Sequence, residues 1–313
     1  MTAPPPRHWP ETGRWPENSR WTATLQGSQV HRWILRKPLV PPAWSDLSAP
    51  LQARFRLIDE AVQGTALLAT CLPQAGLQGA LPPPLMAHKG LHHHLTALFP
   101  PITSPIDLGR ARSELAAIDR LGDPAAAIRE SGALHALQHL ARDVCPAATL
   151  REGDIATQAD PGGRHVVFPG VETIAGQMKR LDRLLAADRR EPRAFAATVA
   201  LLLITNCHAF TDGNGRVARV VFNAVLRPSE PAVTHYLPLR EIATFARGGY
   251  IIRARQAEIH GNWAPLADFM LAAVRFWQGR LTAQLPSARS GNSTGAPPPG
   301  RPSAAQDSLS LQR

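Results

Sequence analysis

Cysteine, lysine and long apolar runs are scarce in this sequence of 313 residues, and each absence excludes a class of protein. The three cysteines, Cys71, Cys145 and Cys207, are too few and too far apart for a disulfide framework or a zinc site. No stretch of about 18 or more apolar residues occurs, so we expect no membrane-spanning helix. Residues 1–20 also lack the apolar segment of an export signal. We therefore expect a soluble, cytoplasmic protein, although an effector secreted by another route stays open.

The net charge of +10 comes almost entirely from arginine, since the only lysines are Lys37, Lys89 and Lys179. A basic chain suggests a nucleic-acid ligand. The arginines are spread along the chain, however, without a basic block and without interleaved aromatic residues that could stack on bases. We therefore expect no nucleic-acid partner, and we expect the charge to favour ATP and acidic proteins.

The two ends of the chain have compositions unlike its middle. Trp-Pro-Glu occurs twice, at residues 9–11 and 15–17, and the prolines around it exclude a regular helix. We predict that the tryptophans of this arm pack on the following domain, with docking on a partner as the alternative. Serine, glycine, proline and alanine dominate residues 283–313, which predicts a disordered tail.

Most of the remaining sequence has helical periodicity. Apolar residues at helical spacing predict helices over residues 46–71, 108–121, 124–144, 195–204 and 217–226, with further helices between 250 and 277. Asp123 followed by Pro124 is typical of a helix start. Asp-Pro-Gly-Gly at residues 160–163 predicts a turn before a strand at His165–Phe168. The fold class is therefore mostly α with one short β-hairpin.

Two groups of histidines raise the question of a metal site. His88 and residues 92–94 lie in a proline-rich stretch without acidic or cysteine neighbours, which favours a solvated loop. His135 and His139 are four residues apart on one face of a predicted helix, but the glutamate of the zinc-protease pattern is absent. We interpret this pair as structural.

The stretch from Thr205 to Arg219 contains a histidine, a carboxylate, a Gly-Asn-Gly turn and two arginines. It joins two apolar segments that we predict to be helices, so it forms a helix-loop-helix. Gly213 and Gly215 have no Cβ, so the backbone can turn with positive φ close to a ligand. Unpaired amides at the start of the second helix favour an anion such as phosphate.

The charged residues of this stretch suit a nucleoside triphosphate. Arg216 and Arg219 lie three residues apart on the second helix and can bind phosphate oxygens from one side. Asp212 beside a phosphate would be repelled unless a divalent cation such as Mg²⁺ lay between them. His208, at the end of the first helix, can accept a proton from an incoming hydroxyl.

The run His-Ala-Phe-Thr-Asp-Gly-Asn-Gly-Arg-Val-Ala-Arg from His208 to Arg219 resembles the core motif of the Fic (Fic/Doc, or Fido) family at eight positions. Members of that family usually transfer AMP from ATP to a protein Ser, Thr or Tyr hydroxyl, and pyrophosphate leaves. The resemblance implies that His208 is the catalytic base and that Asp212 is the ligand of Mg²⁺. With ATP as co-substrate, the implied nucleotide-binding residues are Phe210, which fixes the loop, together with Gly213, Asn214, Gly215, Arg216 and Arg219.

Two positions modify this resemblance. In the Doc branch, which phosphorylates, a lysine stands in place of Gly215, so the glycine favours nucleotidyl transfer. Ala209 stands where most family members have proline, so we expect a less rigid turn.

The segment His165–Phe168 resembles the family's flap, where the backbone of a target protein pairs as an added strand. A target protein with a hydroxyl side chain is therefore the implied partner, and a separate antitoxin would be a second one.

Fic proteins are often silenced by a helix with the pattern Ser or Thr, three residues, Glu, then Gly or Asn, whose glutamate pairs with the second arginine of the motif. No intact copy occurs in this sequence. The nearest is Asp-Glu-Ala-Val-Gln-Gly at residues 59–64, which has Gln63 in place of the glutamate. A neutral amide cannot form this charge pair with Arg219. We expect weak autoinhibition or none, and the alternative is an ordinary core helix.

The combined prediction is a mostly α-helical chain: a Fic-type helical bundle with a short β-hairpin flap, plus a helical N-terminal extension. Its predicted parts are a Pro/Trp-rich arm over 1–45, the extension over 46–122, the Fic domain over 123–282 and the tail over 283–313. The predicted function is protein adenylyltransferase. The open alternatives are a transferase with another nucleotide donor, removal of AMP from a modified protein, a non-catalytic nucleotide-binding or interaction module, and a toxin.

Overall fold

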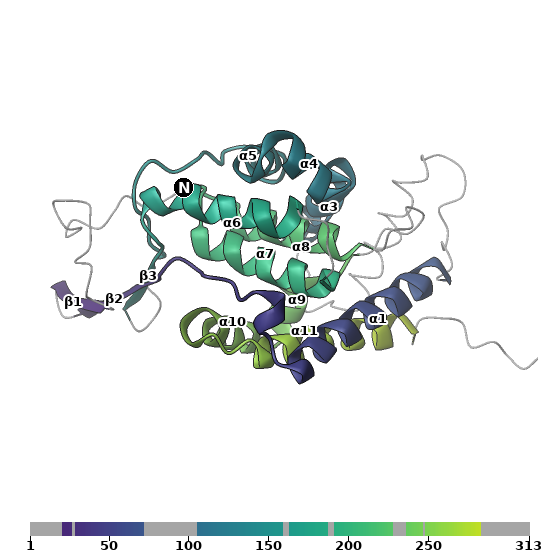
Figure 1. Cartoon of the computed structure of the whole chain (residues 1–313). Coiled ribbons are helices and arrows are strands. Elements are labelled where there is room, and N and C mark those ends of the chain that lie inside the picture. The colour runs from purple at the N-terminus through teal and green to yellow at the C-terminus, as the bar shows by residue number, and fades with distance from the viewer. Residues whose placement is uncertain are drawn as a thin grey trace, which may run out of the picture.

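The computed structural model of the chain describes residues 21–26, 29–71, 105–158, 163–186, 191–227, 236–246 and 248–282. The first part of the predicted N-terminal arm, the histidines at 88 and 92–94, and the predicted tail lie outside the described residues. The described chain is mostly helical, as predicted, with one small sheet (Figure 1). Among the described helices, none combines the length and apolarity needed to cross a membrane.

The helices run in chain order. They are η1 (Trp44–Asp46), α1 (Ala49–Cys71), α3 (Pro105–Leu121), α4 (Pro124–Ser131), α5 (Ala133–Val144), η2 (Val171–Thr173), α6 (Ile174–Ala186), α7 (Arg193–Cys207), α8 (Asn214–Leu226), α9 (Leu239–Phe245), α10 (Gly249–His260) and α11 (Ala264–Thr282). The strands are β1 (Trp21–Gln26), β2 (Gln29–Leu35) and β3 (Arg164–Val167).

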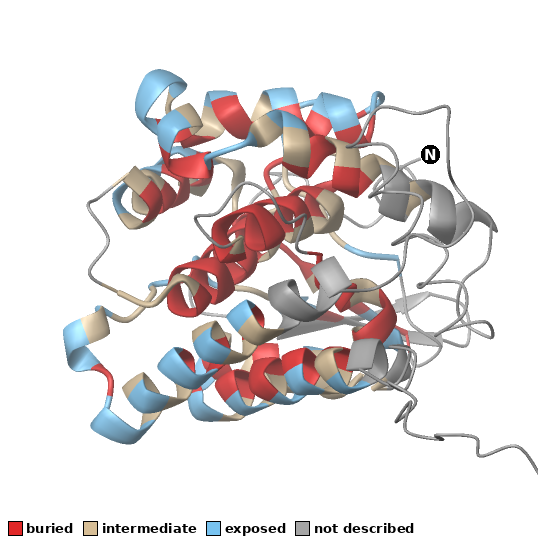
Figure 2. Ribbon diagram, turned by 90° about the vertical axis from the view of Figure 1, so that its right-hand side faces the viewer, coloured by how far each residue is buried: buried red, intermediate tan, exposed pale blue. Residues whose placement is uncertain are grey.

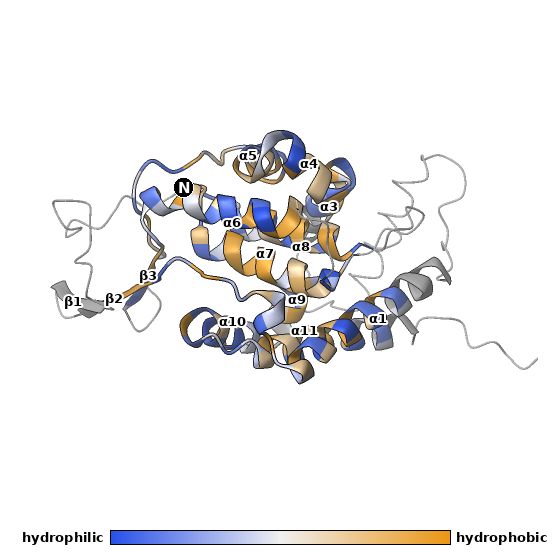
Figure 3. Cartoon of the chain, viewed as in Figure 1, coloured by the Kyte–Doolittle hydropathy of each residue, from blue (hydrophilic) through white to orange (hydrophobic). Residues whose placement is uncertain are grey.

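Helix α7 is the centre of the fold. It is apolar on every face, and only Arg193 and Thr205 of its residues are not buried. A helix that is hydrophobic all round requires neighbours on all sides, and α6, α8 and α1 pack against it. Figure 3 shows α7 as a nearly continuous apolar helix, and Figure 2 shows the buried residues concentrated at the centre of the bundle.

The other helices form layers on either side of α6, α7 and α8. On one side, α3 and α5 pack on α8, and α4 packs on α6 (Figure 1). On the other side lies a layer in which α1 and α10 pack on α11. Helix α1, from the predicted N-terminal extension, is therefore joined closely to the last described helix.

One predicted helix is two helices in the structure. The sequence pattern predicted a single helix from Pro124 to Val144, whereas α4 ends at Ser131 and α5 begins at Ala133. Gly132 between them has φ of 77°, a left-handed conformation that ends the first helix. The predicted helix start is confirmed, because the side chain of Asp123 accepts a hydrogen bond from the Ala125 amide at 2.9 Å.

The sheet has the order β1-β2-β3 and lies at one end of the bundle (Figure 1). Strands β1 and β2 are antiparallel, with Trp21 opposite Ile34. Strands β2 and β3 are parallel, and Arg32 to Leu35 pair with Arg164 to Val167. Nothing in the sequence of the N-terminal arm predicted these strands.

The predicted hairpin is present beside β3. Ala156 bridges Val167 in the antiparallel sense, and the Phe168 amide donates to the Ile155 carbonyl at 3.0 Å. Residues 159–162, which contain the predicted turn, lie outside the described residues. Both edges of β3 are therefore paired within the chain, one with residues 155–157 and the other with β2.

Two tryptophans of the arm pack on the domain, as predicted. Trp33 is 2% exposed and stacks on His165 with ring centroids 4.0 Å apart. The ring centroid of Trp44 lies 6.3 Å from that of Phe55 and 5.2 Å from that of Phe195. These aromatic contacts fix the start of α1 against α7.

Candidate active site

The predicted base, His208, caps the C-terminus of α7. It has φ of 48° and ψ of 52°, and among the described residues it is the only non-glycine with positive φ. This left-handed conformation is unfavourable for a residue with a Cβ and persists only where the surroundings enforce it. The His208 amide donates to the Ile204 carbonyl at 3.0 Å, which ends the helix and turns the chain into the loop.

Arg151 holds this strained turn from the opposite side. Its side chain is almost fully buried, and its Nε donates to the His208 carbonyl at 2.9 Å. Its Nη2 donates to the carbonyls of Cys207, at 3.3 Å, and Pro169. The last carbonyls of a helix have no hydrogen-bond donor within the helix. Here the buried guanidinium of Arg151 is the donor for two of them. Arg151 therefore links the end of α7 to the segment after β3.

The imidazole of His208 is kept neutral by its surroundings. The Phe168 ring stacks on it with centroids 3.7 Å apart and planes 17° from parallel. Burial, and next the charge of Arg36, lower the pKa of His208 to about 3, against an ordinary value of 6.5. Because the folded-state pKa lies below the unfolded one, this residue's contribution to stability is lost as the pH falls from 6.5 toward 3. At neutral pH the ring can accept a proton.

The loop after His208 is closed by Asn214. The Asn214 side chain accepts a hydrogen bond from the Phe210 amide at 3.0 Å and donates to the Phe210 carbonyl at 2.7 Å. Both residues are buried. The loop also pairs with the segment after α5, because the Arg151 amide donates to the Ala209 carbonyl and the Thr211 amide to the Thr149 carbonyl. These bonds give the loop a definite shape although it lacks the family's proline at Ala209.

The predicted phosphate cradle is the start of α8. Gly213 is its N-cap with φ of 80°, and the first amides of a helix have no acceptor within it. The side chain of Asn214 is used for the loop, so only its backbone amide remains for a phosphate. Gly215 is the next residue, and a Cβ there would lie 3.4 Å from Nη1 of Arg219.

Replacing Gly213 with alanine should destabilise this loop. The new Cβ would sit in a left-handed backbone and 2.9 Å from the Cβ of Cys145. Strain and overpacking together should lower the free energy of unfolding by about 2–4 kcal/mol, measured by urea denaturation. Gly176→Ala is the matched control, because nothing lies within 4 Å of a Cβ at that helical position. Equal stability of the two variants would contradict this reading of Gly213.

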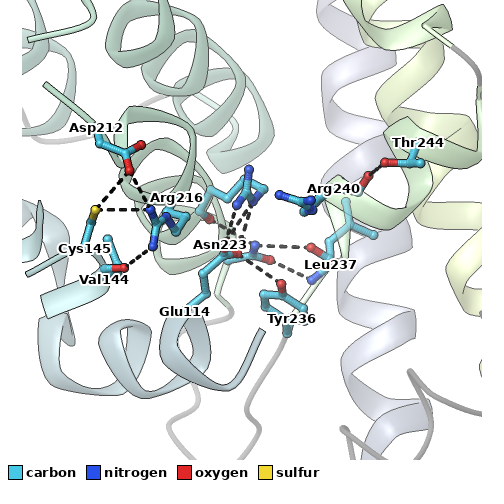
Figure 4. A network of polar contacts seen from close by, with 11 residues as sticks. Glu114, Val144, Cys145, Asp212, Arg216, Asn223, Tyr236, Leu237, Arg240 and Thr244 are labelled. Carbon is cyan, nitrogen blue, oxygen red and sulfur yellow. Dashed lines mark hydrogen bonds and ion pairs between the residues drawn. The ribbon is translucent and has the colours of Figure 1, made fainter. Parts of the chain in front are cut away.

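Asp212, the predicted metal ligand, is exposed and ionised. Burial disfavours its charge, but hydrogen bonds from the Gly213 amide and the Cys145 thiol, with the charge of Arg216, outweigh it and lower the pKa of Asp212. The Cys145 Sγ donates to Oδ2 at 3.4 Å, and Nη2 of Arg216 lies 3.3 Å from the same oxygen (Figure 4). The described residues contain no group of three or more metal-binding side chains. A single carboxylate is sufficient for an Mg²⁺ site, because the other ligands of this ion are usually phosphate oxygens and water.

Arg216 is held at the end of α5. Its Nη1 donates to the Val144 carbonyl at 2.7 Å, and its Nη2 contacts the Cys145 Sγ at 3.1 Å (Figure 4). Nothing in the sequence pattern assigned Cys145 to the site. In the structure it contacts both the predicted metal ligand and a predicted phosphate ligand. Cys207, by contrast, is fully buried, and burial raises its pKa to about 11, so its thiol stays protonated at neutral pH.

Arg219, the second predicted phosphate ligand, is occupied by Glu114 of α3. Its Nε lies 3.1 and 3.2 Å from the two carboxylate oxygens, and its Nη2 also bonds Oε1. Burial opposes the charge of Arg219, but the Glu114 carboxylate outweighs it and raises the pKa of Arg219. The Tyr236 hydroxyl donates to Oε2 of Glu114 at 3.2 Å (Figure 4). The Glu114 side chain is 2% exposed, so this is a buried, bidentate ion pair.

The nearest match to the inhibitory pattern, residues 59–64, lies on α1, and the carboxylate that pairs with Arg219 comes from another helix. Gln63 is exposed on α1, a helix that packs on α11 and α7. The carboxylate that meets Arg219 comes instead from α3, which packs on α8. The sequence around Glu114 does not have the family pattern, because Arg110 and Leu115 occupy its first and last positions. One feature of the sequence pointed to Glu114. It lies four residues before the apolar Ile118 and so on the same, buried face of the helix, where a carboxylate requires a partner.

The predicted flap residues lie beside the base. Phe168, directly after β3, contacts His208. His165 instead stacks on Trp33, and its Nδ1 donates to the Thr157 carbonyl at 3.0 Å. The interpretation of His135 and His139 as structural is not tested, but their Nε2 atoms lie 3.0 Å apart on the exposed face of α5. The site thus brings together the loop, α3, the end of α5, β3 and the segment after β2.

The chain is similar to one family of known proteins and to several solved structures. The sequence model of the Fic/DOC family matches residues 127–226. A Fic family protein from Desulfovibrio desulfuricans G20 is similar with a TM-score of 0.47 and 18% sequence identity, covering 76% of this chain and 68% of that one. Fic-1 from C. elegans is similar with a TM-score of 0.46 and 17% identity, covering 75% and 73%. A search of curated proteins found no match.

Proposed function

This chain is a Fic-family protein, with the Fic/DOC match at residues 127–226, and we propose that it transfers AMP from ATP to a Ser, Thr or Tyr hydroxyl of a target protein. Members of the family generally transfer nucleotide-derived groups to proteins. One observation carries the proposal for this chain. A neutral imidazole, an ionised and exposed carboxylate and the amide-rich start of a helix lie on one loop of six residues, His208 to Gly213.

The proposed reaction is an in-line displacement at the α-phosphorus. The target hydroxyl oxygen forms a bond to this phosphorus, and the bond to the pyrophosphate oxygen breaks. His208 takes the hydroxyl proton, and the leaving pyrophosphate carries away the electron pair. The amides at the start of α8 and the guanidinium of Arg216 stabilise the negative charge of the phosphates. Asp212 would hold Mg²⁺, which neutralises phosphate charge when bound.

Transfer of AMP is favoured over transfer of phosphate by Gly215. A lysine at this position belongs to the phosphorylating Doc branch, and Gly215 offers only a backbone amide. The Arg219 guanidinium, where a terminal phosphate would bind, is at present paired with Glu114. A productive complex therefore requires this ion pair to open. Because Glu114 belongs to the chain itself, inhibition would need no separate antitoxin.

The proposed target docks near His165–Phe168. Both edges of β3 are paired within the chain. A target strand added to β3 would therefore take the place of β2, which contributes no hydroxyl side chain between Gln29 and Leu35. The bound target would then present its hydroxyl to His208 beside the Phe168 ring.

The test is to incubate the purified protein with Mg²⁺, a host lysate and ATP labelled at the α or the γ position. Label from the α position alone should appear in protein, and it should require Mg²⁺. Label from the γ position would indicate phosphorylation instead. ATP binding without transfer of either label would favour another donor or a non-catalytic module.

A further inference from the structure

The residues that follow β2 cross the C-terminal end of α7. We call Arg36–Leu39 the strap; it lies outside the family match at residues 127–226. The side chain of Asn206, which is 1% exposed, holds it by accepting from the Leu39 amide at 3.0 Å and donating to the Lys37 carbonyl at 3.1 Å. Arg180 of α6 also donates to the Leu39 carbonyl at 3.0 Å. The strap is therefore fixed to the domain independently of the pairing of β2.

Arg36 is the residue of the strap that points into the site. Its side chain is 10% exposed and forms an ion pair with Glu258 of α10. Its Nη1 donates to the Thr205 carbonyl at 3.0 Å, and its guanidinium lies 5.2 Å from the centre of the Phe168 ring. Burial lowers the pKa of Arg36 to about 10, so it remains charged at neutral pH.

Two of the three groups that Arg36 contacts also act on His208. The Phe168 ring stacks on the imidazole. The backbone of Thr205 also acts on the imidazole and raises the pKa of His208; a carbonyl oxygen has this effect because it favours the protonated ring. Arg36 and His208 therefore meet at one carbonyl and one ring. A donor that fixes this carbonyl fixes the orientation of the imidazole.

We propose that Arg36 is a positioning residue for His208, acting through the Thr205 carbonyl and the Phe168 ring. This inference rests on the proposed role of His208 as the base. It extends the site beyond the family match, because the N-terminal strap becomes part of the catalytic arrangement.

Electrostatics supports the same role. Three charged groups act on His208: Arg36 from the strap, Arg151 after α5, and Asp212 from the loop. The two arginines lower the pKa of His208 and Asp212 raises it, and the effect of Arg36 is second only to burial. The charge of Arg36 therefore disfavours protonation of the imidazole, whereas the charge of Asp212 favours it.

The experiment compares Arg36→Gln and Arg36→Lys with Arg180→Gln in the full chain. Glu258 keeps Arg255 as a partner at 3.0 Å in the Arg36 variants, so it is not left unpaired. Arg180→Gln is the matched control, because it removes a bond to the strap without touching His208. The imidazole of His208, assigned with His208→Gln, is followed by NMR against pH. Thermal unfolding checks that each variant is folded.

We expect the titration midpoint of His208 to rise in Arg36→Gln toward the ordinary value of about 6.5, and to stay low in Arg36→Lys and Arg180→Gln. Where transfer is measurable, kcat should fall about tenfold in Arg36→Gln, less than for loss of the base itself, with KM for ATP unchanged. An unchanged midpoint in Arg36→Gln, or an equal rise in Arg180→Gln, would overturn the proposal. The NMR result does not depend on turnover, so it can be separated from a failure of the proposed function.

Discussion

His208→Ala is expected to lower the rate of AMP transfer by about 10²–10⁴-fold, the usual contribution of a positioned base. The imidazole is neutral at working pH, since its pKa is about 3, and the one carboxylate of the loop, Asp212, has the proposed role of holding Mg²⁺. Affinity for Mg·ATP should hardly change, because the proposed phosphate ligands are the amides of α8 and Arg216. The measurement is the initial rate of label transfer from α-labelled ATP, with ATP affinity measured separately by calorimetry.

His260→Ala is the control for this variant, because His260 is exposed at the end of α10. It should transfer AMP at the wild-type rate. Thermal unfolding should show that His208→Ala remains folded, since alanine keeps the backbone carbonyl that Arg151 holds. Transfer at an undiminished rate in folded His208→Ala would exclude His208 as the base.

Glu114→Gln is expected to raise the rate of transfer. The carboxylate now bonds both Nε and Nη2 of Arg219. Hydrogen bonds to a charged group contribute about 1.5–3 kcal/mol each, so weakening this pair should increase affinity for ATP and the transfer rate about tenfold or more. The amide keeps the shape of the side chain and one hydrogen bond. Titration of the variant with Mg·ATP, followed by the rate assay, checks both effects.

Gln63→Glu is the matched control for Glu114→Gln. Gln63 is exposed on α1, away from the α3–α8 contact, so a carboxylate there should change neither ATP affinity nor rate. Glu114→Gln should also lower the unfolding temperature, because Arg219 loses its buried counter-charge. If Glu114→Gln binds ATP no more tightly than the wild type, the ion pair is structural and does not inhibit.

The residues that the sequence predicted best are those whose geometry is local. His208 to Arg219 occupy one loop and one helix turn, so glycine spacing and helical periodicity were sufficient to place them together. The apolar character of α7 likewise fixed it as a core helix. The short strand at β3 followed from the turn signal and its β-branched residues. In each case the relevant contacts lie within a few residues of one another.

The residues that were missed act over long distances in the chain. Glu114 and Arg219 are 105 positions apart, and Arg36 and Thr205 are 169 apart. Periodicity within one helix cannot report which helix lies opposite, so the sequence pattern did not show that Arg219 pairs with α3. The strands of the N-terminal arm were missed for a related reason: β2 pairs with β3, and pairing partners are set by the tertiary fold.

The most direct test of the central claim is the mass of the group added to a protein target. Glu114→Gln protein would be incubated with Mg·ATP and a host lysate, with Glu114→Gln/His208→Ala in parallel, and modified peptides identified by mass spectrometry. The account predicts Ser, Thr or Tyr peptides heavier by one adenylyl group with the first protein and none with the second. A phosphoryl group on those peptides, or adenylylation that survives loss of His208, would contradict it.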